Sequence, residues 1–206
     1  MGVTLAQKMN DGKFVASSLR EDELFTFYRA DGVRDTLSTG KAPYPFRFQG
    51  IDDTSLKVKK RIFEYRLKYN GHNDKFVVCY CLNNLFEIYN SDGSLHKRII
   101  APYPYLVDTN HLSADKLGVP IAELIFTFKD CCLTDDRIFL LYNGSSPTGM
   151  IGAQSKIYVF DYEGNPIKYY LLDRYAHSFC IDKQGGVIYA LSDENDQKQV
   201  VRYSML

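Results

Sequence analysis

Three tyrosines stand at related places along the chain and offer aromatic rings for binding. Tyr44 and Tyr103 each lie between two prolines, and Tyr175 has a comparable place further on. Aromatic rings repeated around an opening can stack on sugars or grip a peptide. The competing interpretation is that Tyr-Pro stiffens a turn and packs in the interior, which is the commoner use of aromatic residues. We keep Tyr44, Tyr103 and Tyr175 as candidate ligand-binding residues.

A histidine with acidic neighbours is the second candidate for chemistry. His111 lies close in sequence to Asp108 and Asp115, a combination found in general bases and in metal sites. No second histidine follows at ligand spacing, so a histidine in a solvated loop is the competing interpretation. We expect neither a metal nor a cofactor, and we keep His111 as a candidate ligand-binding residue.

A glycine-rich segment, residues 143–152, has the composition of a mobile binding loop. Its glycines match the spacing of a phosphate-binding loop, but Met150 stands where that loop needs a lysine. Nucleotide binding is therefore excluded, and Asn143 remains a candidate ligand contact.

The five cysteines lack the spacing of a zinc site and lie in apolar segments, so we predict that they are buried small hydrophobes.

The elements that must position these residues follow a repeated pattern. Three strand-like segments end in an acidic residue and glycine, at residues 24–32, 85–93 and 157–164. Glycine there supplies the positive φ of a tight hairpin. A second kind of turn leads into an apolar strand at residues 10–13, 73–75, 134–137 and 182–186. The unit is therefore strand a, turn, strand b, loop, strand c, turn, strand d.

Four antiparallel strands repeated along a chain form the blades of a β-propeller. We predict an all-β fold, a β-propeller made of four-stranded antiparallel blades, with about four units of which the last lacks strand d. It would be one domain over residues 1–206, with units at residues 3–40, 61–101, 123–173 and 176–206. A β-helix needs shorter coils, and a sandwich would not repeat the two-turn signature. In a propeller the b–c loops and the d–a connections share the usual ligand face, where the candidate residues above would lie.

These turns and strands resemble a known family. The motif N-D-G-K-F-V at residues 10–15, followed by F-x-F/I-Y-x-x-D-G at residues 25–32 and 86–93, is similar to that of the TolB-like six-bladed propeller proteins of Bacteroidetes. The resemblance covers essentially the whole chain, and family members end on strand c as this chain does. It implies that the chain holds the C-terminal four blades of a six-bladed ring. It also implies an exported protein, often a lipoprotein, and for most members no assigned function.

Composition excludes several partners. The 25 basic and 25 acidic residues cancel, which gives no electrostatic basis for binding nucleic acid. No apolar run reaches the length of a transmembrane segment. The first residues lack the pattern of a signal peptide. If Met1 is the true start we expect a cytoplasmic protein, and if the chain is an N-terminally truncated family member we expect a periplasmic protein or a lipoprotein.

These observations favour a non-enzymatic recognition propeller that binds a peptide, a protein or a glycan. Two alternatives stay open. One is a structural module that pairs through the blade edge left open by the missing strand d, giving an edge-mediated oligomer. The other is a metal-dependent hydrolase or lactonase-like propeller enzyme, whose candidate residues come from different blades: Asp108, His111, Asn143 and Asp193.

Overall fold

The computed structural model describes residues 6–18, 23–35, 60–100, 125–146, 154–182, 184, 186–194 and 197–205. Across these ranges the strands form four antiparallel sheets, in each of which consecutive strands are neighbours. The predicted all-β fold is confirmed. No helix in the described part of the chain is long and apolar enough to cross a bilayer.

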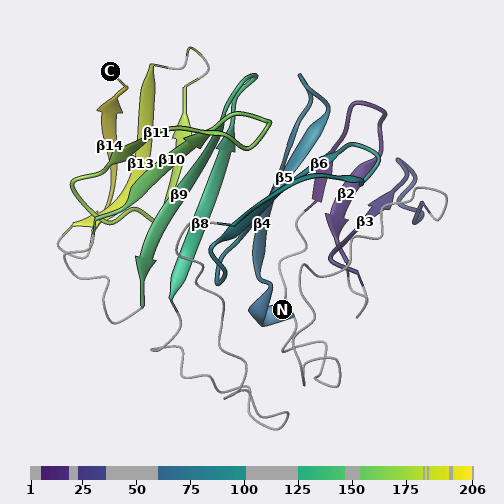
Figure 1. Cartoon of the computed structure of the whole chain (residues 1–206), viewed down its shortest axis with the longest axis horizontal. Helices are drawn as coiled ribbons and strands as arrows, with labels where there is room; N and C mark the ends of the chain where they lie inside the picture. Colours follow the sequence, from purple (N-terminus) through teal and green to yellow (C-terminus); the bar gives the residue numbers. More distant parts are fainter. Residues whose placement is uncertain are drawn as a thin grey trace, which may run out of the picture.

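The four sheets follow one another along the chain and lie side by side in chain order (Figure 1). The first sheet contains β1 (Ala6–Lys8), β2 (Phe14–Ser17) and β3 (Phe25–Tyr28). The second contains β4 (Tyr65–Asn70), β5 (Lys75–Tyr80), β6 (Leu85–Asn90) and β7 (Leu95–Ile100). The third contains β8 (Phe126–Leu133), β9 (Ile138–Ser145), β10 (Lys156–Phe160) and β11 (Pro166–Leu171). The fourth contains β12 (Ser178–Ile181), β13 (Val187–Glu194) and β14 (Gln197–Ser204).

This arrangement is that of propeller blades, and it confirms the predicted fold class. The first strands of the sheets contact one another, β1 with β4, β4 with β8, and β8 with β12. The second and third sheets have four strands, and the fourth sheet has three within the described residues. Its third strand, β14, pairs with β13 over its whole length.

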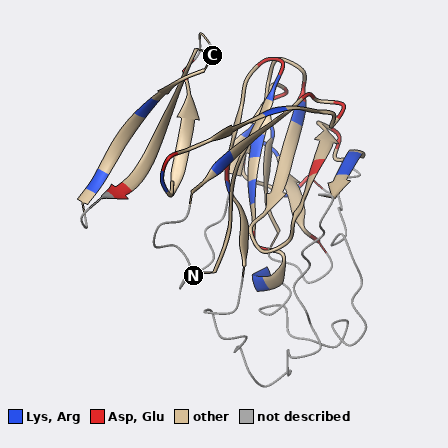
Figure 2. Ribbon diagram, turned by 60° about the vertical axis from the view of Figure 1, so that its left-hand side comes forward, with Lys and Arg blue, Asp and Glu red and all other residues tan. Residues whose placement is uncertain are grey.

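The predicted hairpin turns have the expected backbone. Gly32 and Gly164, which follow Asp31 and Glu163, both have a φ of 78°. Aspartates stabilise these turns by accepting a main-chain N–H two residues further on, as Asp31 does from Val33 at 2.9 Å. Asp and Glu residues accordingly lie at several of the tips where strands turn (Figure 2).

Three separate hydrophobic cores fill the spaces between successive sheets. The alternation of side chains along β5 explains this arrangement. Phe76 and Val78 belong to the core shared with the first sheet, whereas Val77 and Cys79 belong to the core shared with the third. A central strand buried on both faces needs apolar residues at successive positions, and β5 has them from Phe76 to Cys79.

The prediction that the cysteines are buried is confirmed for three of the five. Cys79, Cys81 and Cys131 are buried, Cys132 is half-buried, and all five thiols are free. The prediction is wrong for Cys180, which is exposed. On β12 the neighbouring Phe179 packs into the core against the third sheet, so the alternation of the strand turns Cys180 to the opposite face.

A buried carboxylate on β6 links β5, β6 and β7 of the second sheet. Glu87 has no exposed surface and accepts hydrogen bonds from the hydroxyls of Tyr80 at 2.6 Å and Tyr89 at 2.8 Å. Arg98 on β7 supplies the opposite charge at 2.6 Å. Glu23 and Arg34 form a similar pair in the first sheet. Both buried charges are therefore compensated, as burial requires.

Candidate functional site

Each junction between neighbouring sheets has two ends that carry polar side chains. We call the end formed by the turns after the first and third strands the turn end. The opposite end, formed by the loops after the second strands and by the connections to the next sheet, is the loop end. The loop end is the predicted ligand face.

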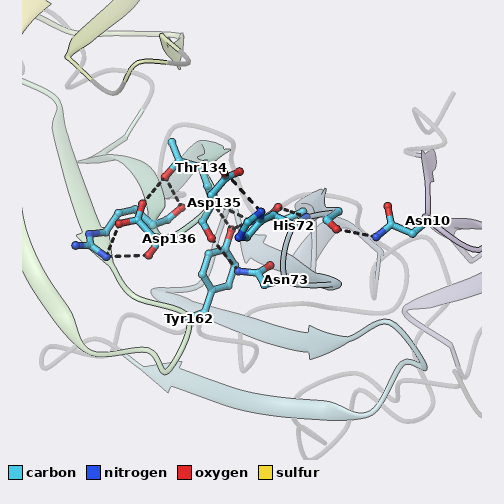
Figure 3. A network of polar contacts seen from close by, with 10 residues as sticks. Asn10, His72, Asn73, Thr134, Asp135, Asp136 and Tyr162 are labelled. Atoms are coloured by element: carbon cyan, nitrogen blue, oxygen red, sulfur yellow. Dashed lines mark hydrogen bonds and ion pairs between the residues drawn. The ribbon is translucent and has the colours of Figure 1, made fainter.

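A hydrogen-bonded cluster joins the second and third sheets at the turn end (Figure 3). The Asn70 side-chain amide donates to the Tyr162 hydroxyl at 2.6 Å and to the Thr134 carbonyl at 2.8 Å. The Tyr162 hydroxyl in turn donates to the Thr134 carbonyl at 3.0 Å. Burial raises the pKa of Tyr162 to about 12, so its hydroxyl stays a neutral donor. All three groups are used within the protein.

Further contacts extend this network to the first sheet. The Asn10 side chain donates to the Gly71 carbonyl at 2.7 Å, and Asn73 donates to the Asp135 carbonyl at 3.2 Å (Figure 3). His72 lies 3.8 Å from the carboxylate of Asp135. Asn73 Oδ1 is buried without a partner among the described residues. In each of these two contacts an asparagine at a turn donates to a main-chain carbonyl of the next sheet. These hydrogen bonds hold neighbouring sheets together.

The second and third sheets also approach closely at the outer part of the turn end. A Cβ atom added to Gly164 would lie 2.8 Å from the side chain of Ile99 on β7. His96 Nε2, on the same strand, lies 3.2 Å from the carboxylate of Glu163. Glycine at residue 164 is therefore needed both for its positive φ and for the contact with the neighbouring sheet.

The loop end between the third and fourth sheets is built around Ser155. Its hydroxyl donates to Asn143 Oδ1 at 2.6 Å and accepts from the Ala176 main-chain N–H at 2.8 Å. Asn143 Nδ2 donates to the Ala176 carbonyl at 3.3 Å. Asn143 is buried, and its amide binds Ser155, which precedes β10, and Ala176, on the connection that leads from β11 to β12.

Tyr175 lies on that connection, and its main-chain carbonyl and its hydroxyl differ in their contacts. Its carbonyl accepts from Ser192 Oγ at 2.6 Å, which fixes the main chain to β13. The hydroxyl oxygen is inaccessible to solvent and has no hydrogen-bond partner among the described residues. Burial raises the pKa of Tyr175, whereas the Asn143 amide, which lies near the hydroxyl but outside hydrogen-bond geometry, lowers it. A buried hydroxyl without a partner costs about 1–3 kcal/mol, so it calls for an explanation.

A histidine–aspartate pair lies beside Tyr175. His177 Nε2 is 2.6 Å from Asp193 Oδ2, and the two side chains are 34% and 46% exposed. The Tyr175 and His177 rings meet edge to face with centroids 5.0 Å apart. We call Asn143, Tyr175, His177 and Asp193 the junction site. It combines an aromatic ring, an imidazole and a carboxylate that solvent can reach.

The structure brings some of the predicted residues together. Tyr175 and Asn143 meet in the junction site, with Asp193 beside them. Tyr44, Tyr103 and His111 lie outside the described residues. Asp108, like most of the predicted loop at residues 143–152, also lies outside them.

Sequence reasoning did not select His177. It lies just before β12, and its main-chain N–H donates to the Leu191 carbonyl of β13 at 2.8 Å. This pairing brings His177 next to Asp193, 16 residues away in sequence. The residue pairing of the β12–β13 hairpin, counted outward from its turn, is the sequence signal that could have identified His177 and Asp193 as neighbours. Over the described residues, no group of three or more His, Cys, Asp or Glu gathers as a metal site would require.

Two solved structures of similar fold come from Bacteroides species. A member of the duf4221 family from Bacteroides vulgatus has a TM-score of 0.55 at 9% identity, covering 98% of this chain and 64% of that one. A putative 6-phosphogluconolactonase from Bacteroides uniformis has a TM-score of 0.51 at 11% identity, covering 97% and 54%. The chain therefore spans less than two thirds of either structure. At these identities the likeness shows the fold alone.

The sequence comparisons give the family. No curated protein matches the chain. A family described as TolB-like 6-blade propeller-like matches residues 1–184. This match confirms the resemblance that the turn motifs indicated. The chain belongs to the TolB-like six-bladed propeller family.

Proposed function

We propose that the chain is a non-enzymatic recognition module that binds its ligand at the junction site. The observation that carries the proposal is the Tyr175 hydroxyl, which is buried without a hydrogen-bond partner among the described residues. The partly exposed pair of His177 and Asp193 lies directly beside it. A ligand that displaces the groups covering this hydroxyl and accepts its hydrogen bond would remove the cost of leaving it unpaired.

The chemistry of the junction site favours a glycan over a peptide or a protein. Asp193 offers a carboxylate that accepts from hydroxyl groups, and Tyr175 offers a donor. The ring of Tyr175 beside these groups suits the apolar face of a sugar. A protein partner would instead be expected to bury a central apolar anchor, whereas the two side chains of this site that are about a third to a half exposed, His177 and Asp193, are polar.

An oligosaccharide array of neutral and acidic glycans tests the proposal, with affinities measured on the glycans that are retained. Tyr175→Phe removes only the unpaired hydroxyl and is expected to weaken binding by about 2- to 10-fold. His177→Ala should weaken it further, because the Asp193 carboxylate loses the group that orients it. Tyr189→Phe, a partly exposed tyrosine on β13 outside the site, is the control and should bind as the wild type does.

Two results would contradict the proposal. One is a wild-type chain that retains no glycan on the array. The other is a retained glycan whose affinity is the same in the wild type, Tyr175→Phe and His177→Ala. Thermal unfolding of each variant shows whether a loss of binding comes from a loss of fold.

A further inference from the structure

The outer strand of the third sheet, β11, carries an exposed apolar stripe. β11 is the last strand of its sheet in the described part of the chain (Figure 1). Ile167, Tyr169 and Leu171 are 43%, 61% and 54% exposed. A sheet edge presents unpaired main-chain N–H and C=O groups, and exposed apolar residues there favour pairing with another strand.

The equivalent strand of the second sheet, β7, is protected against self-pairing. Its middle residues are His96, Lys97 and Arg98. Every antiparallel pairing of two β7 strands through their middle places two of these cationic or basic groups opposite each other. Like charges directly opposite destabilise a strand pair. β7 therefore opposes self-pairing with three consecutive basic residues, whereas β11, which begins at Pro166, has a single basic residue, Lys168, in its middle.

Two β11 strands are complementary to each other in one antiparallel register. With Tyr169 on a two-fold axis, Tyr169 faces Tyr169 of a second copy. Ile167 then faces Leu171 of the second copy, and apolar side chains meet apolar ones. Lys168 faces Tyr170 of the second copy rather than another lysine. The two residue types are compatible, since within the chain Lys168 Nζ already lies 4.8 Å from the centre of the Tyr170 ring.

We propose that β11 pairs with β11 of a second copy of this chain, so that one antiparallel sheet runs through a two-fold symmetric homodimer. The same surface on both copies forms such an interface, which requires the self-complementarity that β11 has. The fourth sheet also has an outer strand, β14, but a propeller blade places its fourth strand at that position. This inference does not involve the junction site and goes beyond the proposed function.

A charge exchange at the two-fold axis tests the proposal on the 206-residue chain. Tyr169→Lys and Tyr169→Glu each place like charges opposite each other, so each variant alone should be a monomer in sedimentation velocity. An equimolar mixture of the two variants should form a dimer again, because opposite charges then meet. The wild type should be a dimer. Ile100→Lys, at a 45% exposed residue of β7, is the control and should remain a dimer.

Three outcomes would overturn the proposal. The first is a wild type that stays monomeric up to the highest soluble concentration. The second is a dimer that survives in both Tyr169 variants, or a mixture of them that stays monomeric. The third is a dimer that is lost instead on Val200→Lys, a change on the 70% exposed residue of β14. Circular dichroism establishes that each variant is folded.

Discussion

Tyr162 and Tyr175 each lie in a junction between two neighbouring sheets, but their hydroxyls are used differently. Tyr162, at the turn end, accepts from Asn70 and donates to the Thr134 carbonyl. Tyr175, at the loop end, has no such partner among the described residues. Burial raises the pKa of both hydroxyls, so both are neutral and differ only in their surroundings. The difference lies in the use of the hydroxyls: at the turn end the Tyr162 hydroxyl links two sheets, whereas at the loop end Asn143 and Ser155 make the links.

The largest expected loss of stability is that of Gly164→Ala, which tests whether the second and third sheets are in close contact at the turn end. Gly164→Ala combines a left-handed φ with a clash against Ile99. It should lower the free energy of unfolding by about 2–4 kcal/mol. Gly32→Ala is the matched control, with the same φ of 78° and nothing within 4 Å of the added Cβ. It should cost about 1–2 kcal/mol. Equal losses in urea unfolding would show that the two sheets do not press together there.

The next largest effect is the difference in stability between Tyr162→Phe and Tyr175→Phe. Tyr162→Phe leaves the Asn70 amide and the Thr134 carbonyl without one of their partners, and should lower the free energy of unfolding by about 1–3 kcal/mol. Tyr175→Phe removes a hydroxyl that has no partner in the described structure, and should leave stability unchanged or slightly increased. Denaturant unfolding of both variants measures the difference. A larger loss for Tyr175→Phe would reverse the assignment of roles to the two ends.

The smallest effect is the alkaline stability that Tyr162 contributes. Its pKa is about 12 in the folded chain against an ordinary value of 10.0. Between these values the unfolded chain loses the proton while the folded chain keeps it. The contribution is therefore complete below pH 10 and is lost as the pH rises toward 12. Unfolding free energies measured across this range should fall less steeply in Tyr162→Phe than in the wild type. An unchanged slope would show that the hydroxyl is not buried in the folded chain, since burial is the main cause of the raised pKa.

The strands could be predicted from the sequence because local chemistry determines them. β-forming residues followed by Asp-Gly specify a strand and a tight turn, and Gly32 has the positive φ that this pattern needs. The order of the turns then gives the order of the strands, including the three-stranded fourth sheet. No contact between distant parts of the chain was needed for these conclusions.

The junction site could be predicted only in part, because its properties arise from contacts between sheets. The topology placed Asn143 and Tyr175 at the same end of neighbouring sheets. That Asn143 is buried follows from the positions of Ser155 and Ala176, which no local pattern reveals. That the Tyr175 hydroxyl has no described partner is likewise a property of the packed structure.

The three separate cores have a consequence for how the chain unfolds. Each core is shared by two successive sheets, so a sheet is stabilised by its immediate neighbours. The molecule is thermodynamically a one-dimensional array, in which stability is a sum of units and of interfaces between adjacent units. A sheet with a neighbour on each side is held by two interfaces. In the 206-residue chain, amide hydrogens in the second and third sheets should therefore exchange last, because each of these sheets shares two of the described cores.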